Sequence, residues 1–172
     1  FDSPFYSHPK IMLGGGSNVL FLEDFPGLVI KNNLLGIEVV EETHEQVYVA
    51  VQGGEAWHDF ILFCVQQGYG GFENLSLIPG SVGAAPIQNI GAYGVELKDH
   101  FVSLKAIDLN TGSVKTFDKA ACEFGYRDSI FKKKGAPAYL ITEVLFELTK
   151  NPQFKLEYPG IEEKMRALGY HT

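Results

Sequence analysis

Hydrophobic and polar residues along this 172-residue chain change their spacing several times, and each spacing predicts a different element. The segment Gln46–Gln52 alternates, with its valines on one face and Tyr48 on the other, as in a half-buried strand. From Ala56 to Gln67 the period becomes helical, and Gly68 follows as a C-terminal stop. The apolar face of this predicted helix comprises Trp57, Phe60, Ile61, Cys64 and Val65.

Other segments predict further strands and two further helices. Two strands, Phe101–Leu109 and Val114–Phe117, are joined by the turn sequence Asn110-Thr111-Gly112. Asp118 follows as the cap of a short helix through Cys122. Apolar runs at residues 11–13, 19–22 and 28–30, a strand at 139–148 and a helix at 161–168 complete the pattern. Many strands with few helices between them indicate an α+β fold rather than a doubly wound parallel sheet.

Composition narrows the class of protein. The chain is 45% hydrophobic, which suits one domain or two small ones, and its net charge of −7 is spread along the sequence. Nucleic-acid surfaces need clustered basic residues, and the only basic run is Lys132-Lys133-Lys134. The cysteines and histidines have no metal-binding spacing, and no apolar run reaches membrane-spanning length. We therefore expect a soluble, cytoplasmic monomer that binds no metal, nucleic acid or membrane.

Residues 77–94 hold four glycines, two prolines and no charged side chain. Regular helices and strands of that length exclude so many breakers, and a solvated loop normally carries charge. Glycine lets backbone N–H groups approach a ligand closely, and the segment adds neutral hydrogen-bonding groups from Ser81, Gln88, Asn89 and Tyr93. The segment is therefore either the lining of a large ligand's site or a tight structural loop on a sheet.

A second glycine cluster, Gly14-Gly15-Gly16-Ser17-Asn18, follows the first apolar run. Consecutive glycines form a nest of backbone donors that suits a pyrophosphate, although a sharp turn would use the same residues. No lysine follows as in a Walker A loop, and Val19–Leu22 lacks the helical period that the Rossmann fingerprint requires. Two uncharged glycine segments in one small chain favour a long ligand with contacts at both ends, such as a dinucleotide.

A third segment, Phe124–Phe131, places Arg127 among aromatic and apolar neighbours. An arginine in this setting either pairs with Asp128 or grips an anionic ligand through its bidentate fork. Tyr126 is able to hydrogen-bond the same ligand. The two glycine segments favour the ligand interpretation, and the structural ion pair stays open as the alternative.

Together, these three segments resemble the UDP-N-acetylenolpyruvoylglucosamine reductase family. Gly14–Leu20 resembles the phosphate-binding loop of that family, Glu73–Gly94 its second flavin-binding stretch, and Phe124–Phe131 its substrate-side segment. They occur in the family's order and at about its spacing, over residues 10–148. The resemblance implies a two-subdomain FAD-binding fold of the vanillyl-alcohol-oxidase/PCMH type, with the first subdomain incomplete.

The resemblance also implies a reaction in peptidoglycan precursor synthesis for the bacterial cell wall. Such flavoproteins use NADPH to reduce UDP-N-acetylglucosamine enolpyruvate to UDP-N-acetylmuramate, so the expected cofactor is FAD and the expected partners are NADPH and a UDP-sugar. Arg127 would be the catalytic residue that stabilises negative charge at the substrate carboxylate, with Tyr126 and Tyr93 as further substrate contacts. The implied FAD contacts are Gly14, Gly15, Gly16, Ser17, Asn18, Ser81, Ile87, Gln88, Asn89 and Gly91.

The sequence departs from that family at the proton donor. The family's donor is a serine in a Gly-Ser-Phe-Phe-type run of a third domain, and no such run is present here. We therefore expect residues 1–35 to be a remnant of the first FAD-binding subdomain, 36–150 the second subdomain, and 151–172 a connector toward a substrate-binding domain. On this division the chain alone is an inactive fragment. A flavin-dependent oxidase on the same scaffold and a non-catalytic ligand-binding domain remain as alternatives.

Overall fold

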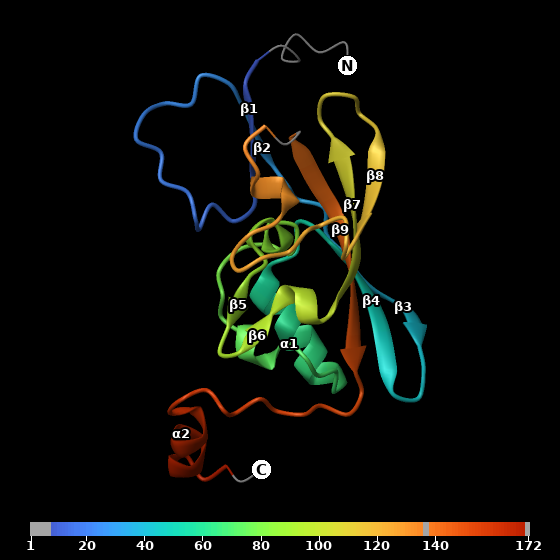
Figure 1. Cartoon of the computed structure of the whole chain (residues 1–172), viewed down its shortest axis with the longest axis vertical. Coiled ribbons are helices and arrows are strands. Elements are labelled where there is room, and N and C mark those ends of the chain that lie inside the picture. Colours follow the sequence, from blue (N-terminus) through green and yellow to red (C-terminus); the bar gives the residue numbers. More distant parts are fainter. Residues whose placement is uncertain (1–7, 136–137, 171–172) are drawn as a thin grey trace.

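A single antiparallel sheet forms the centre of the molecule. The computed structural model describes residues 8–135 and 138–170, so residues 1–7 of the predicted first-subdomain remnant lie outside it. The sheet consists, in spatial order, of β3 (Ile37–Glu42), β4 (Gln46–Gln52), β9 (Tyr139–Thr149), β7 (Phe101–Asp108) and β8 (Val114–Asp118). Figure 1 shows helix α1 (Trp57–Gln67) on one side of this sheet. The predicted mixture of helix and antiparallel strand is confirmed.

Helix α1 packs on the sheet because both elements bury apolar faces. The valines of β4 are fully buried, as its alternation predicts. The rings of Trp57 and Phe60 lie 6.0 and 5.2 Å from the ring of Phe146 on β9. Val65 is 54% exposed, which contradicts its predicted place on the buried face. It lies about 100° further round the helix than Cys64, at the edge of the buried stripe.

The glycine segment at 77–94 closes over the N-terminus of α1. The backbone N–H of Trp57 donates to the carbonyl of Gly80 at 3.0 Å. A Cβ at Gly83 would lie 2.8 Å from the carbonyl oxygen of Gly53, so only glycine permits this close approach. The short elements of this region are the 3₁₀ turns η1 (Glu73–Leu75), η2 (Ala85–Gln88) and η3 (Leu97–Asp99), and the hairpin of β5 (Gly91–Ala92) and β6 (Val95–Glu96).

The second glycine cluster connects the two strands of a separate, parallel pair. These strands are β1 (Lys10–Leu13) and β2 (Leu28–Lys31), and the loop between them projects from the body of the molecule (Figure 1). The apolar run 19–22 lies in this loop and is exposed, with Leu20 83% exposed. Apolar character alone therefore does not bury this run, and each of its four side chains is at least 43% exposed.

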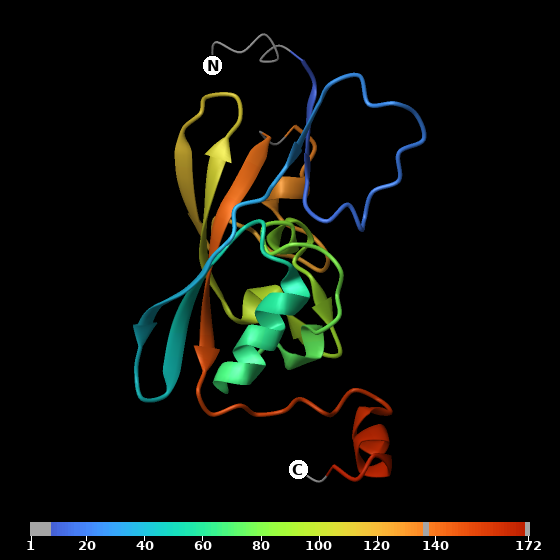
Figure 2. The ribbon, with the colours of Figure 1, turned by 180° about the vertical axis from the view of Figure 1, so that it is seen from behind.

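The segment after β8 is a turn, which corrects the predicted short helix. The Oδ1 atom of Asp118 accepts a hydrogen bond from the N–H of Ala121 at 2.7 Å, as a helix cap would. The chain then leaves the helical path and runs to the 3₁₀ turn η4 (Ile130–Lys132). Figure 2 shows helix α2 (Ile161–Ala167) at the end of an extended segment. Within residues 8–135 and 138–170, no helix has the length and apolar character that crossing a membrane requires.

An ion pair at the β7–β8 turn is expected to make stability depend on pH. Asp108 accepts hydrogen bonds from Lys115 Nζ and from the N–H of Asn110, both at 2.9 Å, and the Lys115 contact chiefly lowers the pKa of Asp108. Such a carboxylate stabilises the fold above its unfolded-state pKa of about 3.9, and the gain is lost as pH falls through the lower, folded-state pKa. In the parent, the urea unfolding midpoint should fall as the pH is lowered, and Asp108→Asn should make this fall smaller. A fall of the same size in the variant and the parent would contradict this.

Candidate functional site

The two glycine segments lie face to face across a cleft. A Cβ placed on Gly15 would lie 3.6 Å from the Cα of Gly80, so the two backbones are separated by little more than one methyl group. Asn18 Nδ2 donates to Gln88 Oε1 at 3.1 Å and joins the segments at one end. Trp57 also lines the cleft, beside the N-terminus of α1. The structure therefore brings together residues seventy positions apart that the sequence assigned to one ligand.

Ser81 carries an unsatisfied hydroxyl in this cleft. Its Oγ is buried and has no hydrogen-bond partner within the described residues. A Cβ at Gly14 would lie 2.4 Å from that oxygen, so the absence of a side chain at Gly14 leaves room for the hydroxyl. A buried polar group without a partner costs about 1–3 kcal/mol, and such groups are rare in folded proteins. The geometry suits a polar ligand that supplies the missing hydrogen bond.

The residues that follow Ser81 divide between the cleft and the interior. Ile87 and Gln88 line the cleft, and the carbonyl of Ile87 accepts a hydrogen bond from Ser129 Oγ at 2.7 Å. Asn89 is fully buried and has a positive φ of 41°. Its Nδ2 donates to Gly125 O at 2.9 Å and its Oδ1 accepts from the N–H of Lys98 at 3.0 Å. The Asn89 amide therefore joins three chain segments rather than facing the cleft.

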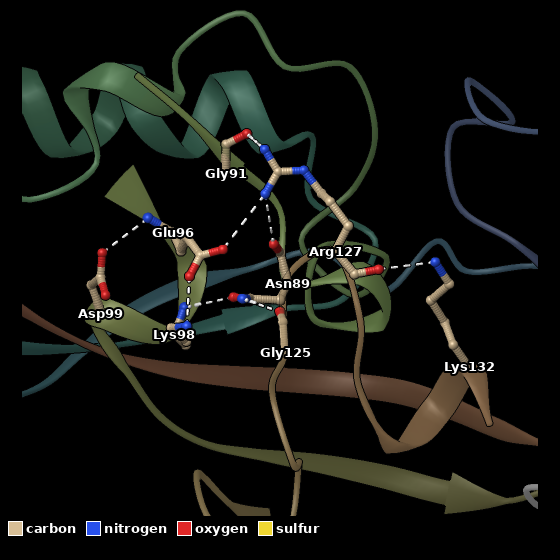
Figure 3. A network of polar contacts seen from close by, with 8 residues as sticks. All are labelled: Asn89, Gly91, Glu96, Lys98, Asp99, Gly125, Arg127 and Lys132. Carbon is tan, nitrogen blue, oxygen red and sulfur yellow. Dashed lines mark hydrogen bonds and ion pairs between the residues drawn. The ribbon is translucent and has the colours of Figure 1, made fainter. Parts of the chain in front are cut away.

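Arg127 is fixed mainly by backbone carbonyls of the glycine segment (Figure 3). Its Nη2 donates to the carbonyl of Gly91, and its Nη1 lies 3.5 Å from the carbonyl oxygen of Asn89. Nη1 is also 3.7 Å from Glu96 Oε1. The alternative ion-pair partner, Asp128, makes no salt bridge with Arg127 in the described structure. A Cβ at Gly91 would lie 2.7 Å from Nη1, so glycine at this position admits the guanidinium.

The three predicted substrate-side residues line one open cavity, next to the cleft but separate from it. Tyr93, Tyr126 and Arg127 share its wall with Lys155 and Tyr158. Tyr126 is 84% exposed, and its ring lies 5.1 Å from the Arg127 guanidinium carbon. Gly91 lines this cavity rather than the cleft between the glycine segments. One set of predicted residues thus surrounds a neutral cleft, and the other lines a cavity whose wall also carries Lys155 and the carboxylates of Glu96 and Asp99.

Two polar residues that the sequence did not single out complete this arrangement. Ser129 is fully buried and ties the third segment to the glycine segment through Ile87. Glu96 lies two residues beyond the uncharged stretch and pairs with both Arg127 and Lys98. Its hydrogen bond from Lys98 raises the pKa of that lysine. Ser129 lies inside a segment already recognised, whereas the role of Glu96 depends on contacts made only in the folded chain.

Both cysteines are buried, and we expect neither to be reactive. Loss of hydration raises the pKa of Cys64 and of Cys122 to about 12. Because the thiolate is the nucleophile, a thiol with this pKa stays protonated and inert at pH 8. Ellman's reagent should therefore leave the folded protein unmodified and titrate both thiols in urea. A thiol that reacts within seconds in the folded protein would contradict the structure. The described residues also contain no cluster of three or more His, Cys, Asp or Glu that could hold a metal.

The chain matches a known family of cofactor-binding domains. Residues 4–118 match the model of a family described as "FAD binding domain", and they make up more than half of the chain. The chain therefore belongs to the FAD binding domain family. A crystal structure of UDP-N-acetylenolpyruvylglucosamine reductase from Thermus caldophilus has the same fold, with a TM-score of 0.68 and 22% identity. That match covers 96% of this chain and 58% of the other.

The specific likeness is to UDP-N-acetylenolpyruvoylglucosamine reductases. The chain is 48% identical over 171 residues to the reductase of Amoebophilus asiaticus, covering 99% of this chain and 50% of the relative. It is 49% identical over 162 residues to that of Paraburkholderia xenovorans, covering 94% of this chain and 47% of the relative. The resemblance inferred from the three segments is thus confirmed. The chain spans about half the length of these curated relatives.

Proposed function

We propose that this chain is the FAD-binding core of a reductase that converts UDP-N-acetylglucosamine enolpyruvate to UDP-N-acetylmuramate with NADPH. The chain is 48% identical, over almost its whole length, to a protein named as such a reductase. This identity supports a UDP-sugar as the substrate. The positions of the three segments support it independently, because a neutral cleft and a cavity containing Arg127 lie next to each other. A domain that only binds a ligand would not need a second cavity with an arginine beside its ligand cleft.

The cleft residues fit an FAD molecule. The unpartnered Ser81 hydroxyl is the observation that carries this assignment, because FAD is rich in hydrogen-bonding groups. Glycine at positions 15 and 80 keeps side chains out of the space between the two backbones. Successive backbone N–H groups in a glycine-rich turn form a concavity that suits phosphate. Gly14, Gly15, Gly16, Ser17 and Asn18 would hold the pyrophosphate, and Ser81, Ile87 and Gln88 would contact the flavin. Asn89 and Gly91 would act by shaping the wall and by fixing Arg127.

Arg127 would bind and orient the substrate. When bound, FAD would supply hydride transfer from NADPH to the enolpyruvyl group. The Arg127 guanidinium would bind the substrate carboxylate and stabilise the negative charge that develops there, more strongly in the transition state than in the ground state. Tyr126 and Tyr93, from the same cavity, would contact the substrate and limit its orientations. The proton donor would come from outside the three segments.

We further propose the division that the sequence indicated. The parallel pair β1/β2 would belong to a first FAD-binding subdomain at 1–35, and the antiparallel sheet with α1 to a second at 36–150. The extended segment and α2, within 151–172, would lead toward a substrate-binding domain. The curated relatives are about twice as long as this chain, which supports a need for further residues in catalysis. We expect residues 1–172 alone to show no turnover.

Ser81→Ala tests the flavin assignment through two effects of different sign. Removing a hydrogen bond to FAD should weaken FAD binding by about 10-fold, since a net hydrogen bond contributes roughly 0.5–1.5 kcal/mol. In the flavin-free protein the same change removes an unsatisfied buried hydroxyl, so the urea unfolding midpoint should stay equal or rise. Absorbance titration with FAD and urea unfolding give the two numbers.

The matched control is Ser129→Ala. Ser129 Oγ donates to the Ile87 carbonyl and accepts from the N–H of Phe131, so its removal should destabilise the flavin-free fold. Unchanged FAD affinity in Ser81→Ala, with the expected loss of stability in Ser129→Ala, would remove Ser81 from the flavin site. Loss of stability in Ser81→Ala would mean that its hydroxyl already has a partner in the flavin-free protein.

A further inference from the structure

The carboxylate of Glu96 is held from three sides. Its Oε2 lies 2.6 Å from Lys98 Nζ, and its Oε1 lies 3.7 Å from Arg127 Nη1. The side chain also accepts a hydrogen bond from the N–H of Asp99, whose own Oδ2 accepts from the N–H of Glu96 at 2.9 Å. This reciprocal cap fixes the start of η3 and with it the carboxylate. Figure 3 shows Glu96 between Lys98 and the guanidinium.

The hydrogen bonds and the ion pair of the Arg127 guanidinium are all made by its two Nη atoms, and the ring of Tyr126 lies 5.1 Å from its central carbon. Nη1 faces Glu96 and the Asn89 carbonyl, and Nη2 donates to the Gly91 carbonyl. Within the described residues, Nε has no hydrogen-bond partner. Figure 3 shows these contacts gathered at the two Nη atoms. The Nε–H and one Nη2–H therefore remain for a ligand, and together they form an edge that binds carboxylate or phosphate bidentately.

We propose that Glu96 is a positioning residue of Arg127: with the Asn89 carbonyl, its capped carboxylate holds the Nη1 side so that the free edge faces the anionic group of the substrate. This inference rests on the proposed function of Arg127. Glu96 itself does not touch the substrate on this account. Charge alone acts in the opposite direction, because a carboxylate so close to Arg127 weakens its attraction for an anion. The two effects therefore predict different results for Glu96→Gln, which keeps the shape and removes the charge.

The experiment measures substrate binding and reaction separately in the full gene product that carries residues 1–172. Stopped-flow absorbance follows reoxidation of the NADPH-reduced flavin by saturating enolpyruvyl substrate, and calorimetry gives substrate affinity for the oxidised protein. Glu96→Gln should slow reoxidation by about 10-fold, while substrate affinity stays equal or increases. This result would mean that the guanidinium still attracts the substrate anion but no longer holds it in the reactive orientation. The control Lys98→Met removes the other ion partner of the carboxylate and should change the rate by less than about 3-fold.

A double variant separates positioning from general structural support. If Glu96 acts through Arg127, Glu96→Gln should add no further slowing in the Arg127→Ala background. Additive slowing, or an unchanged or faster rate in the single Glu96→Gln variant, would overturn the proposal. The ¹⁵Nε order parameter of Arg127 is a test independent of activity, and it should fall below about 0.6 in Glu96→Gln only. If the parent protein fails to react with the substrate, the proposed function fails, and the order parameter still decides the role of Glu96.

Discussion

Replacing Gly15 with valine is expected to weaken FAD binding by about 100-fold and to leave the fold intact. A Cβ at this position would meet the backbone of Gly80 at ordinary contact distances, 3.6 Å from its Cα, 3.9 Å from its carbonyl carbon and 4.0 Å from its nitrogen, so alanine is tolerated. The methyl groups of valine extend beyond that Cβ into the cleft that the glycine segments enclose. Overpacking a fitted site costs roughly 1–3 kcal/mol, and the upper end of this range corresponds to about 100-fold in affinity. Absorbance titration with FAD gives the affinity.

Two further glycine substitutions make this prediction specific. Gly15→Ala should give an intermediate affinity, because it adds the Cβ without the methyl groups. Gly125→Ala is the matched control outside the cleft, where the new Cβ would lie 3.5 Å from the Cβ of Asp128. Gly125→Ala should bind FAD as the parent does. If Gly15→Val also binds FAD as tightly as the parent, FAD does not lie against Gly15 in the cleft.

Arg127→Ala is expected to have the largest effect on the reaction and little effect on flavin binding. In the full gene product, reoxidation of reduced flavin by the enolpyruvyl substrate should slow by about 10²- to 10³-fold, the usual effect of removing one donor from a charge-stabilising site. Arg127 lines the cavity rather than the cleft, so the spectrum of bound FAD should stay unchanged. Stopped-flow absorbance measures both quantities in one experiment.

Lys132→Ala controls for general loss of positive charge beside the cavity. Lys132 Nζ donates to the backbone carbonyl of Arg127 at 3.0 Å, so this change removes a neighbouring cation and keeps the guanidinium. Its effect on reoxidation should stay within about 3-fold, as for an exposed charge. Equal slowing in both variants would assign the effect to the net charge of the cavity, and an unchanged rate in Arg127→Ala would remove Arg127 from the mechanism.

Elements with a clear period were predicted from the sequence because burial on one face imposes that period. Strand β4 and helix α1 are the plainest cases, and the error at Val65 concerns only the edge of the buried stripe. The run 19–22 is apolar but exposed, so local hydrophobicity does not by itself specify burial. Strand β3 carries charged residues at 38, 41 and 42, which hides its alternation, and it forms by pairing with β4.

Candidate residue types were recognisable from the sequence, whereas their arrangement required the fold. Glycines and neutral polar residues indicated a ligand site. That Gly15 lies opposite Gly80 depends on how the β1/β2 loop meets the N-terminus of α1, which the sequence does not show. Asn89 was predicted as a ligand contact, and the fold adds that its amide joins Gly125 to Lys98. Glu96 carried no local signal, because its importance comes from Arg127, thirty-one residues further along the chain.

Hydrogen–deuterium exchange with and without FAD tests the central claim most directly, because it reports both binding and its location. The account predicts that FAD slows exchange at the amides of residues 14–18 and 80–88. The β7–β8 turn at 108–115 lies outside the cleft and should exchange equally in both states. Protection at both glycine segments would establish the cleft between them as the flavin site. FAD binding without protection at either segment would contradict the account.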